Sequence, residues 1–372
     1  MKQKMKKKPP KYILGAMVGS SLDGVDVTLI NETLDLASAT HTHQPICSIL
    51  KKNIQSLRLS PTIAPDTLHA CDQQLGEEIA SACLHAIEAS QVSKESIHAI
   101  AIHGATLFHQ PKGPYGYSWQ IGNAQLIGLR TGLPVINDFR NKDIFLGGEG
   151  APLAPLFHHA FFSHTNQTRA LVNIGGISNI SVLQPQENPF GFDCGPGNTL
   201  LDDIMRAHFN KDYDHQGAMA SEGKVDFELL KICLQHPFVK QQPPKSTSQI
   251  DFNLPWFQEI LSTHKPHLSA HDQLCTLTEF TACCISQSIL EINIPIHDVI
   301  VCGGGAHNRF LMQRIQAQLP KHSIQTTLAY GLDPDYVEST GFAWLGLQHT
   351  KNKAMHGLSN FEKKFIYGSF HP

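Results

Sequence analysis

The stretch ILGAMVGSSLDGVDVTLI, residues 13–30, consists of two apolar runs joined by a polar turn that contains glycine. Apolar runs on either side of a short turn are typical of a β-hairpin, so we expect strands over 12–18 and 25–30. Glycine and serine at the tip leave room for close approach and supply N–H and hydroxyl donors. The pattern therefore predicts a hairpin whose tip is suited to an anion such as phosphate.

Two further glycine turns have the same character. RALVNIGGISNISVL, residues 169–183, reads as a second strand–turn–strand unit, and DVIVCGGGAHNRFLMQRI, residues 298–315, as strand, triple-glycine turn and helix. None of the three matches the Walker A or the G-x-G-x-x-G pattern, and one glycine turn alone is usually only a turn. Together they favour two hairpins that hold a triphosphate, a helix N-terminus for the rest of the nucleotide, and a nearby acid that binds Mg²⁺ through water.

The remaining pattern alternates strands with helices. Apolar residues at helical spacing predict helices over 65–90, 122–132, 273–292 and 337–348, and short apolar runs predict strands over 98–104 and 134–138. GFDCGPGNTLLDDIM, residues 191–205, reads as a glycine-rich turn that opens a helix, and 240–256 as a loop. This alternation predicts an α/β protein with two sheet-based domains, each opening with a hairpin.

Composition excludes several classes of protein. The 372 residues are 41% hydrophobic and 16% charged with a net charge of −3, which fits a globular protein and gives no sign of a nucleic-acid surface. The 22 histidines show no metal-ligand spacing. The nine cysteines form no CxxC pair, so we expect free thiols in a reducing compartment, the cytoplasm.

The N-terminus MKQKMKKKPP precedes the apolar run 12–18 and has two interpretations. Lysines before an apolar run occur in signal peptides, but this run is short, ends in Gly-Ser-Ser and has no A-x-A site. A disordered basic tail before the first strand is the favoured interpretation. No run approaches the roughly 18 apolar residues of a transmembrane helix, so we expect no membrane partner.

The chain resembles the anhydro-N-acetylmuramic acid kinases. The resemblance rests on GAMVGSSLDGVDV and continues, in the family's order, through DFRNKDIFLGGEGAPLAPLFHHAFF, LVNIGGISNISVL, GFDCGPGNTLLDDIM, PPKSTSQIDFNLPW, CGGGAHNRFLM and DPDYVESTGFAWLG. These blocks span about residues 13–346. They are long, and therefore far more specific than a single motif.

The resemblance implies two ribonuclease H-like domains around a nucleotide cleft, as in sugar kinases, Hsp70 and actin. We expect an N-terminal domain over 1–137, joined by a C-terminal helix at about 347–372, and a C-terminal domain over 138–346. ATP and Mg²⁺ are the implied cofactors, and a homodimer the implied assembly. The implied reaction opens the 1,6-anhydro ring of anhydro-N-acetylmuramic acid with water and phosphorylates O6.

Site residues follow from the resemblance position by position. Asp138, in NDFR, matches the family's catalytic acid, whose role would be general base for the attacking water. The purely structural alternative for Asp138 is a helix cap or a partner of Arg140. Glu338 would face the sugar, or be only an acid in the first turn of a helix. Asp193 would hold Mg²⁺, or cap the following helix. The other implied sugar contacts are His103 and Thr106. The implied nucleotide contacts are Gly19, Ser20, Ser21, Leu22, Asp23, Gly24, Val25, Asp26, Asn173, Gly175, Gly176, Gly303, Gly304, Gly305 and Asn308.

Several positions depart from the family pattern. Ser20 replaces the usual Thr, Ala105 a usual Gln, Asn123 a usual Asp, and Ser339-Thr340 follow Glu338 where small or apolar residues are common. The changes at Ala105 and Asn123 support one alternative, a kinase of the same fold for another amino or anhydro sugar. A second alternative is a nucleotide-binding regulator without phosphoryl transfer, which would need no catalytic base, so Asp138 argues against it. A pure glycosidase is weaker, because it needs no phosphate-type turns.

Overall fold

The structure is a computed structural model that describes residues 11–60, 62–248, 250–357 and 363–372. The chain divides into two compact units: Met1–Leu153 with Glu338–Pro372, and Ala154–Val337. The predicted basic tail lies outside the described residues.

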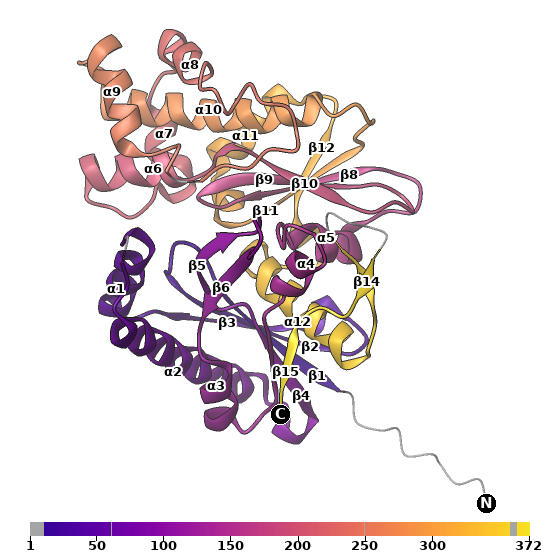
Figure 1. Ribbon diagram of the computed structural model, residues 1–372. Helices are drawn as coiled ribbons and strands as arrows, with labels where there is room; N and C mark the ends of the chain where they lie inside the picture. Colours follow the sequence, from indigo (N-terminus) through magenta and orange to yellow (C-terminus); the bar gives the residue numbers. More distant parts are fainter. Residues whose placement is uncertain (1–10, 61, 249, 358–362) are drawn as a thin grey trace, which may run out of the picture. The chain divides into compact units, whose positions relative to one another are not determined.

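The sheet of the first unit is built on the predicted hairpin (Figure 1). Strands β1 (Tyr12–Val18), β2 (Gly24–Asn31) and β3 (Thr40–Pro45) form an antiparallel meander. Strand β4 (Ile97–Ile102) lies parallel to β1 on its other side, followed by parallel β7 (Val135–Asn137) and antiparallel β15 (Ser369–His371). A separate ribbon, β5 (Ala105–Gln110) with β6 (Tyr117–Ile121), leads away from the end of β4.

Helices cover both faces of this sheet. Alternate β1 residues such as Leu14 and Ala16 face the hydrophobic core beneath α2 (Pro65–Ser90). The same core contains residues of α1 (Ser48–Leu59) and α3 (Ala124–Thr131). Gly15 points to the other face, where α12 (Val337–Thr350) approaches so closely that a Cβ would lie 2.1 Å from the Ser339 carbonyl oxygen. The short helix α4 (Asn141–Phe145) and strands β13 (Met355–His356) and β14 (Lys364–Phe365) complete the unit.

The second unit repeats the strand order of the first. The meander β8 (Arg169–Ile174), β9 (Ile177–Leu183) and β10 (Phe190–Pro196) is extended beside β8 by parallel β11 (Asp298–Cys302) and β12 (Ser323–Thr326). Ile180 and Val182 of β9 pack with residues of α10 (Ala270–Leu290) and α11 (Arg309–Gln318), and Ser181 faces α5 (Ala154–Phe162). The other helices are α6 (Thr199–Ile204), α7 (Ala218–Glu222), α8 (Phe227–Cys233) and α9 (Leu254–His264).

Most predicted elements are confirmed, and two differ. The hairpins, the helix over 65–90 and the helix closed by left-handed Gly132 are present. Residues 190–196, predicted to begin a glycine-rich turn, form strand β10 instead, because they pair with β9 despite Gly191 and Gly195. In place of the expected helix over 347–372, α12 ends at Thr350 and the described residues beyond it contain short strands.

The division into units also differs from the prediction. Residues 138–153, expected in the C-terminal domain, belong to the first unit, as do 338–346. The reason is packing: the Lys142 ammonium donates to the Ile366 carbonyl, and the Arg140 guanidinium to the His103 ring. On α12, Gly346 lies against Ala101 of β4.

Candidate active site

The tip of the first hairpin is anchored by apolar side chains and offers polar groups outward. Leu22, at φ 56°, is fully buried in the core, and its N–H donates to the Gly19 carbonyl at 3.1 Å, which closes the turn. Ser20 and Ser21 are exposed, and among the described residues neither their N–H groups nor their hydroxyls donate a hydrogen bond. The tip is therefore a rigid turn with donors left for an anion.

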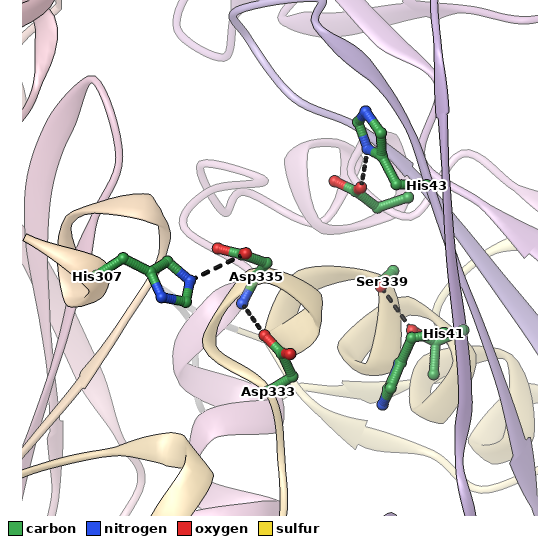
Figure 2. Close-up of polar contacts among 8 residues, drawn as sticks. His41, His43, His307, Asp333, Asp335 and Ser339 are labelled. Carbon is green, nitrogen blue, oxygen red and sulfur yellow. Dashed lines mark hydrogen bonds and ion pairs between the residues drawn. The ribbon is translucent and has the colours of Figure 1, made fainter. Parts of the chain in front are cut away.

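The two acids of this hairpin are paired within the unit. Asp23 accepts from the Lys51 ammonium of α1 at 2.5 Å, and Asp26 contacts the His43 ring of β3 at 2.7 Å (Figure 2). Gly24 permits the second contact, because a Cβ there would lie 2.2 Å from the His43 ring. Both acids thus help to fix the hairpin.

Arg58 of α1 ties the hairpin tip to the β5–β6 ribbon. Its Nη1 donates to the Ser20 carbonyl at 2.8 Å and its Nε to the Thr106 carbonyl at 3.0 Å. The Thr106 hydroxyl accepts from the Gln120 amide at 3.1 Å. Thr106 is therefore placed close to the phosphate-type turn by a cation that the sequence analysis missed.

Asp138 follows β7 directly and has φ 52°, a left-handed conformation that a non-glycine residue adopts at a cost. Its Oδ1 accepts from the Asn141 backbone N–H at 3.3 Å and from the Asn141 amide at 2.7 Å. Asn141 is itself fixed by Ser118 of β6, whose N–H donates to the Asn141 Oδ1 at 2.8 Å. Among the described residues, Oδ2 accepts no hydrogen bond, so one carboxylate oxygen is held and the other is available.

His103 has both ring nitrogens engaged. Nδ1 donates to the Gly104 carbonyl at 2.9 Å, and Nε2 accepts from Arg140 Nε at 3.0 Å and Nη2 at 2.9 Å. Burial and the neighbouring guanidinium lower the pKa of His103 to about 3, so the ring is neutral. His103, predicted to contact sugar, thus has no ring nitrogen left for a ligand in this arrangement.

Glu338 lies in the first turn of α12, as the structural alternative for this residue predicted. Burial raises the pKa of its carboxyl, and Asp26 adds to this, whereas Arg140 acts against it. Among the described residues the carboxyl has no hydrogen bond or ion pair. It is therefore a carboxyl in an unfavourable environment with its bonding capacity unused.

The hydroxyls after Glu338 have a structural explanation. Ser339 and Thr340 are fully buried on α12, where the Ser339 hydroxyl lies 2.7 Å and the Thr340 hydroxyl 3.4 Å from that of Thr28 on β2. His41 of β3 contacts the same Thr28 hydroxyl at 2.9 Å (Figure 2). The departure from small or apolar residues is thus matched by a polar partner on the sheet.

Two other departures are also structural. The side chain of Ala105 is completely buried in the core, so it does not face a ligand. Asn123 caps α3 by accepting from the Leu126 N–H at 3.0 Å, and its amide donates to Asp72 at 2.9 Å. An aspartate at 123 would face Asp72 with a like charge, which explains why this chain has an amide there.

In the second unit, the hairpin turn at Gly175 and Gly176 has its carbonyls occupied. The Gly175 carbonyl accepts from the Asn198 N–H at 2.8 Å, and the Gly176 carbonyl from the Gly197 N–H at 2.9 Å and the Thr199 hydroxyl at 2.8 Å. Within the described ranges, neither glycine's N–H has an acceptor. The turn therefore presents donors, as a phosphate site requires.

The triple-glycine turn after β11 packs on the end of β8. A Cβ on Gly303, which has φ 77°, would lie 2.3 Å from the Asn173 side-chain oxygen, and one on Gly305 would lie 2.2 Å from Ile174. Gly304 differs, because the nearest atom to a Cβ on this residue would be the Asn198 side-chain nitrogen, at 3.8 Å. Asn308 caps α11 by accepting from the Leu311 N–H at 2.9 Å. Two glycines thus permit packing, and the middle one leaves space.

Asp193 lies within β10 and fixes a loop. Its Oδ2 accepts from the Thr247 N–H at 2.9 Å and from the Ser246 hydroxyl at 3.1 Å. Burial raises the pKa of this carboxyl, and these two hydrogen bonds act against the rise. The alternative prediction, that Asp193 caps the next helix, is wrong, because no described side chain caps α6.

A different group of the described residues has metal-ligand spacing. One ligand atom each of His307, Asp333 and Asp335 lies within 4.8 Å of the others. Figure 2 shows the His307 ring directed at the Asp335 carboxylate, at 3.0 Å, while Asp333 accepts from the Asp335 N–H. An exposed ion pair and a turn account for this arrangement.

Sequence reasoning named Asp138 and the glycine turns but missed the residues that hold them. Arg58 and Lys51 belong to no motif, and the bond between His103 and Arg140 joins positions 37 residues apart. One signal was present: in DFRN, Arg140 and Asn141 directly follow the predicted acid.

The architecture defines a class of protein. In both units three antiparallel strands are extended by two strands parallel to the first, which is the ribonuclease H-like order. Two such units, each opening with a hairpin that presents free N–H groups, define the fold of sugar kinases, Hsp70 and actin.

Comparison with known proteins narrows the class. A family model described as anhydro-N-acetylmuramic acid kinase matches residues 11–359. A protein of that name from Pasteurella multocida is 41% identical over 339 residues, covering 91% of this chain and 90% of the relative. Another from Aliivibrio fischeri is 38% identical over 356 residues, covering 95% and 94%. The chain belongs to the anhydro-N-acetylmuramic acid kinase family. Across the described residues, no helix has the length and apolar character needed to span a bilayer.

Proposed function

We propose that this protein uses ATP to convert anhydro-N-acetylmuramic acid into N-acetylmuramic acid 6-phosphate. Membership of the family and the identity to relatives of that name support the proposal. Two departures from the family pattern, Ala105 and Asn123, favoured a kinase for another sugar. The structure gives that alternative no support, because Ala105 is buried and Asn123 caps a helix. A non-catalytic regulator would not need a carboxylate fixed as Asp138 is.

In the proposed reaction Asp138 is the general base. Its Oδ2 takes a proton from water, and the water oxygen attacks C1 of the sugar. The bond between C1 and O6 breaks, and O6 keeps the electron pair. The single observation that supports this role best is the asymmetry of the carboxylate: Asn141 holds Oδ1, and no described residue donates to Oδ2. Such a fixed carboxylate needs no reorganisation before it accepts the proton.

In the same reaction the freed O6 attacks the γ-phosphorus of ATP, and the bond from that phosphorus to the β,γ-bridging oxygen breaks, giving ADP. This step needs alignment and neutralisation of charge more than further acid–base chemistry. As phosphate contacts we propose the unoccupied N–H groups of Ser20 and Ser21, and those of Gly175 and Gly176. Gly304, where a Cβ would come no closer than 3.8 Å to its nearest neighbour, Asn198, is proposed as the third contact.

Mg²⁺ is proposed as the metal, with Asp193 as its protein ligand. The donor set fits, since Mg²⁺ prefers carboxylate and water oxygens, and Asp193 uses only Oδ2 within the protein. A cation would also favour the ionised form of this carboxyl, whose pKa burial raises. When bound, Mg²⁺ would neutralise phosphate charge. Asp23 is less suited to this role, because Lys51 already pairs with it.

We place the reaction in peptidoglycan recycling, in the cytoplasm, and in a homodimer. The substrate is a cell-wall sugar, which supports the first point. The free thiols, eight of the nine cysteines being buried and one exposed, support the second. The dimer rests on the family resemblance.

An ADP-release assay tests the proposed function. Purified protein with Mg-ATP and anhydro-N-acetylmuramic acid should form ADP only when the sugar is present. Asp138→Asn should reduce kcat by about 100-fold or more, because the amide cannot accept the proton. Asp66→Asn, an exposed acid on α2, is the matched control and should behave as wild type. Sugar-dependent activity that survives Asp138→Asn would contradict the assignment.

A further inference from the structure

Arg140 is a half-buried cation with no acid in ion-pair contact among the described residues. It lies two residues after Asp138, and no carboxylate among the described residues comes within the 4.0 Å of an ion pair with it. Ionised groups that are removed from water are normally paired. We propose that Arg140 binds the carboxylate of the sugar's lactyl ether, and that His103 positions Arg140 for this contact. The proposal rests on the proposed function.

The guanidinium is held by His103 at Nε and Nη2 and by one further contact at Nη1, and part of its donor capacity is unused. Nε and Nη2 both donate to His103 Nε2, and Nη1 donates to the Gly150 carbonyl at 2.8 Å. A guanidinium has five N–H donors, so these contacts leave one on each terminal nitrogen. Two parallel donors on adjacent nitrogens match the two oxygens of a carboxylate.

Arg140 keeps its charge without a contacting acid, since Glu338 acts on it only from a distance. Burial lowers its pKa to about 10, still above neutral pH, so the guanidinium remains charged. The facing groups are neutral His103, the Gly150 carbonyl and Glu338, which acts from beyond ion-pair distance. An arriving anion would therefore complete the site rather than displace an existing ion pair.

His103 is suited to position a cation. Its Nδ1 hydrogen is committed to the Gly104 carbonyl, which fixes the tautomer and leaves Nε2 as an acceptor. Phe342 of α12 packs against the same ring, with centroids 4.8 Å apart. His103 thus acts through Arg140. In this proposal Arg140, rather than His103 as the resemblance implied, contacts the sugar.

The proposed substrate supplies the anion. N-acetylmuramic acid differs from N-acetylglucosamine by a lactyl ether whose carboxylate is ionised at neutral pH. A site that pairs with this group rejects the sugar that lacks it, because the cation is then left half-buried and unpaired. The nucleotide's γ-phosphate is the other available anion, and the experiment separates the two.

The test measures kinetics on two sugars. Wild type, Arg140→Gln and Arg140→Lys are assayed with anhydro-N-acetylmuramic acid and with 1,6-anhydro-N-acetylglucosamine, which has no carboxylate. Wild type should favour the acidic sugar in kcat/KM. Arg140→Gln should lose about 10- to 100-fold on the acidic sugar and little on the neutral one. Lysine, without the fork, should restore the preference only in part.

Controls separate the alternatives. Arg130→Gln removes an exposed arginine that pairs with Glu77 on the helices of the same unit, and should change neither sugar. His103→Asn should weaken the preference and leave the KM for ATP unchanged. Equal losses on both sugars in Arg140→Gln, or a raised KM for ATP alone, would overturn the proposal.

The outcome stays distinct from that of the proposed function. If wild type phosphorylates neither sugar, the proposed function fails, and calorimetric binding of the two sugars to wild type decides the role of Arg140 without turnover. Equal affinity of wild type for both sugars would overturn the inference even if every variant failed to fold.

Discussion

At the scale of single residues, the candidate site is defined by groups whose hydrogen bonds are only partly used. Asp138 has one carboxylate oxygen fixed and one unused, Arg140 has N–H donors left over beyond its contacts with His103 and Gly150, and Glu338 has no hydrogen-bond or ion-pair partner among the described residues. Residues that serve only structure are normally satisfied. Ser339, Thr340 and Asn123, by contrast, have their partners within the unit, which marks them as structural despite their departure from the family pattern.

Glu338 gives a prediction about pH. Because its pKa is raised above the ordinary 4.5 in the folded protein, its ionisation opposes folding. Its favourable contribution is complete below pH 4.5 and is lost as pH rises through the raised value. We therefore expect Glu338→Gln to be more stable than wild type at pH 7.5, with the gain shrinking towards pH 5.

Urea unfolding at several pH values measures this difference. Glu88→Gln, which changes an exposed acid on α2, serves as the control and should show no such trend. A Glu338→Gln variant that is less stable than wild type at pH 7.5 would show that the carboxylate is stabilised in the folded state, contrary to this account.

How far the sequence predicts the site also differs from residue to residue. Asp138 and the glycines were found because they lie in continuous motifs. The pairing of His103 with Arg140 was not, because it depends on the ends of β4 and β7 being neighbours in the sheet. The contact between Asn123 and Asp72 was missed for a similar reason, since Asp72 lies on another helix.

At the scale of elements, periodicity and turn chemistry predicted what is long or sharply bounded. The helix Pro65–Ser90 and both hairpins follow directly from their apolar spacing and glycine turns. Strand β10 was missed because its glycines resemble turn residues, and its pairing with β9 outweighs their preference. Strand β15 has only three residues, too few for any periodicity.

Helix α3 provides a test at this scale. Asn123→Ala removes the cap on the Leu126 N–H and the contact with Asp72, so we expect a loss of about 1 kcal/mol in the free energy of unfolding. Steady-state kinetics should show an unchanged KM for the sugar. A raised sugar KM at unchanged stability would return Asn123 to the candidate site.

At the scale of the whole molecule, the family resemblance predicted the class, and packing decided the division of the chain. Both units contain the expected ribonuclease H-like sheet. The first unit gains residues 138–153 and 338–346 because contacts made by Arg140, Lys142 and Gly346 lie within it. Sequence alone could not place that boundary, because no change of composition marks it.

The residues proposed for function fall into both units of the chain. Asp138, His103, Arg140 and Glu338, proposed to act on the sugar, all belong to the first unit. Asp193 and the glycine turns at 175–176 and 303–305, proposed for the metal and nucleotide, belong to the second. Sugar chemistry and part of the nucleotide binding are thus assigned to different units of the chain.

We propose that ring opening by water and phosphorylation are one reaction that depends on Asp138. Mass spectrometry of the product formed from Mg-ATP and anhydro-N-acetylmuramic acid in ¹⁸O-water tests it most directly. We expect wild type to form N-acetylmuramic acid 6-phosphate with one ¹⁸O at C1, and Asp138→Asn to form none. A phosphorylated sugar with its anhydro ring intact, or ¹⁸O in phosphate rather than in the sugar, would contradict it.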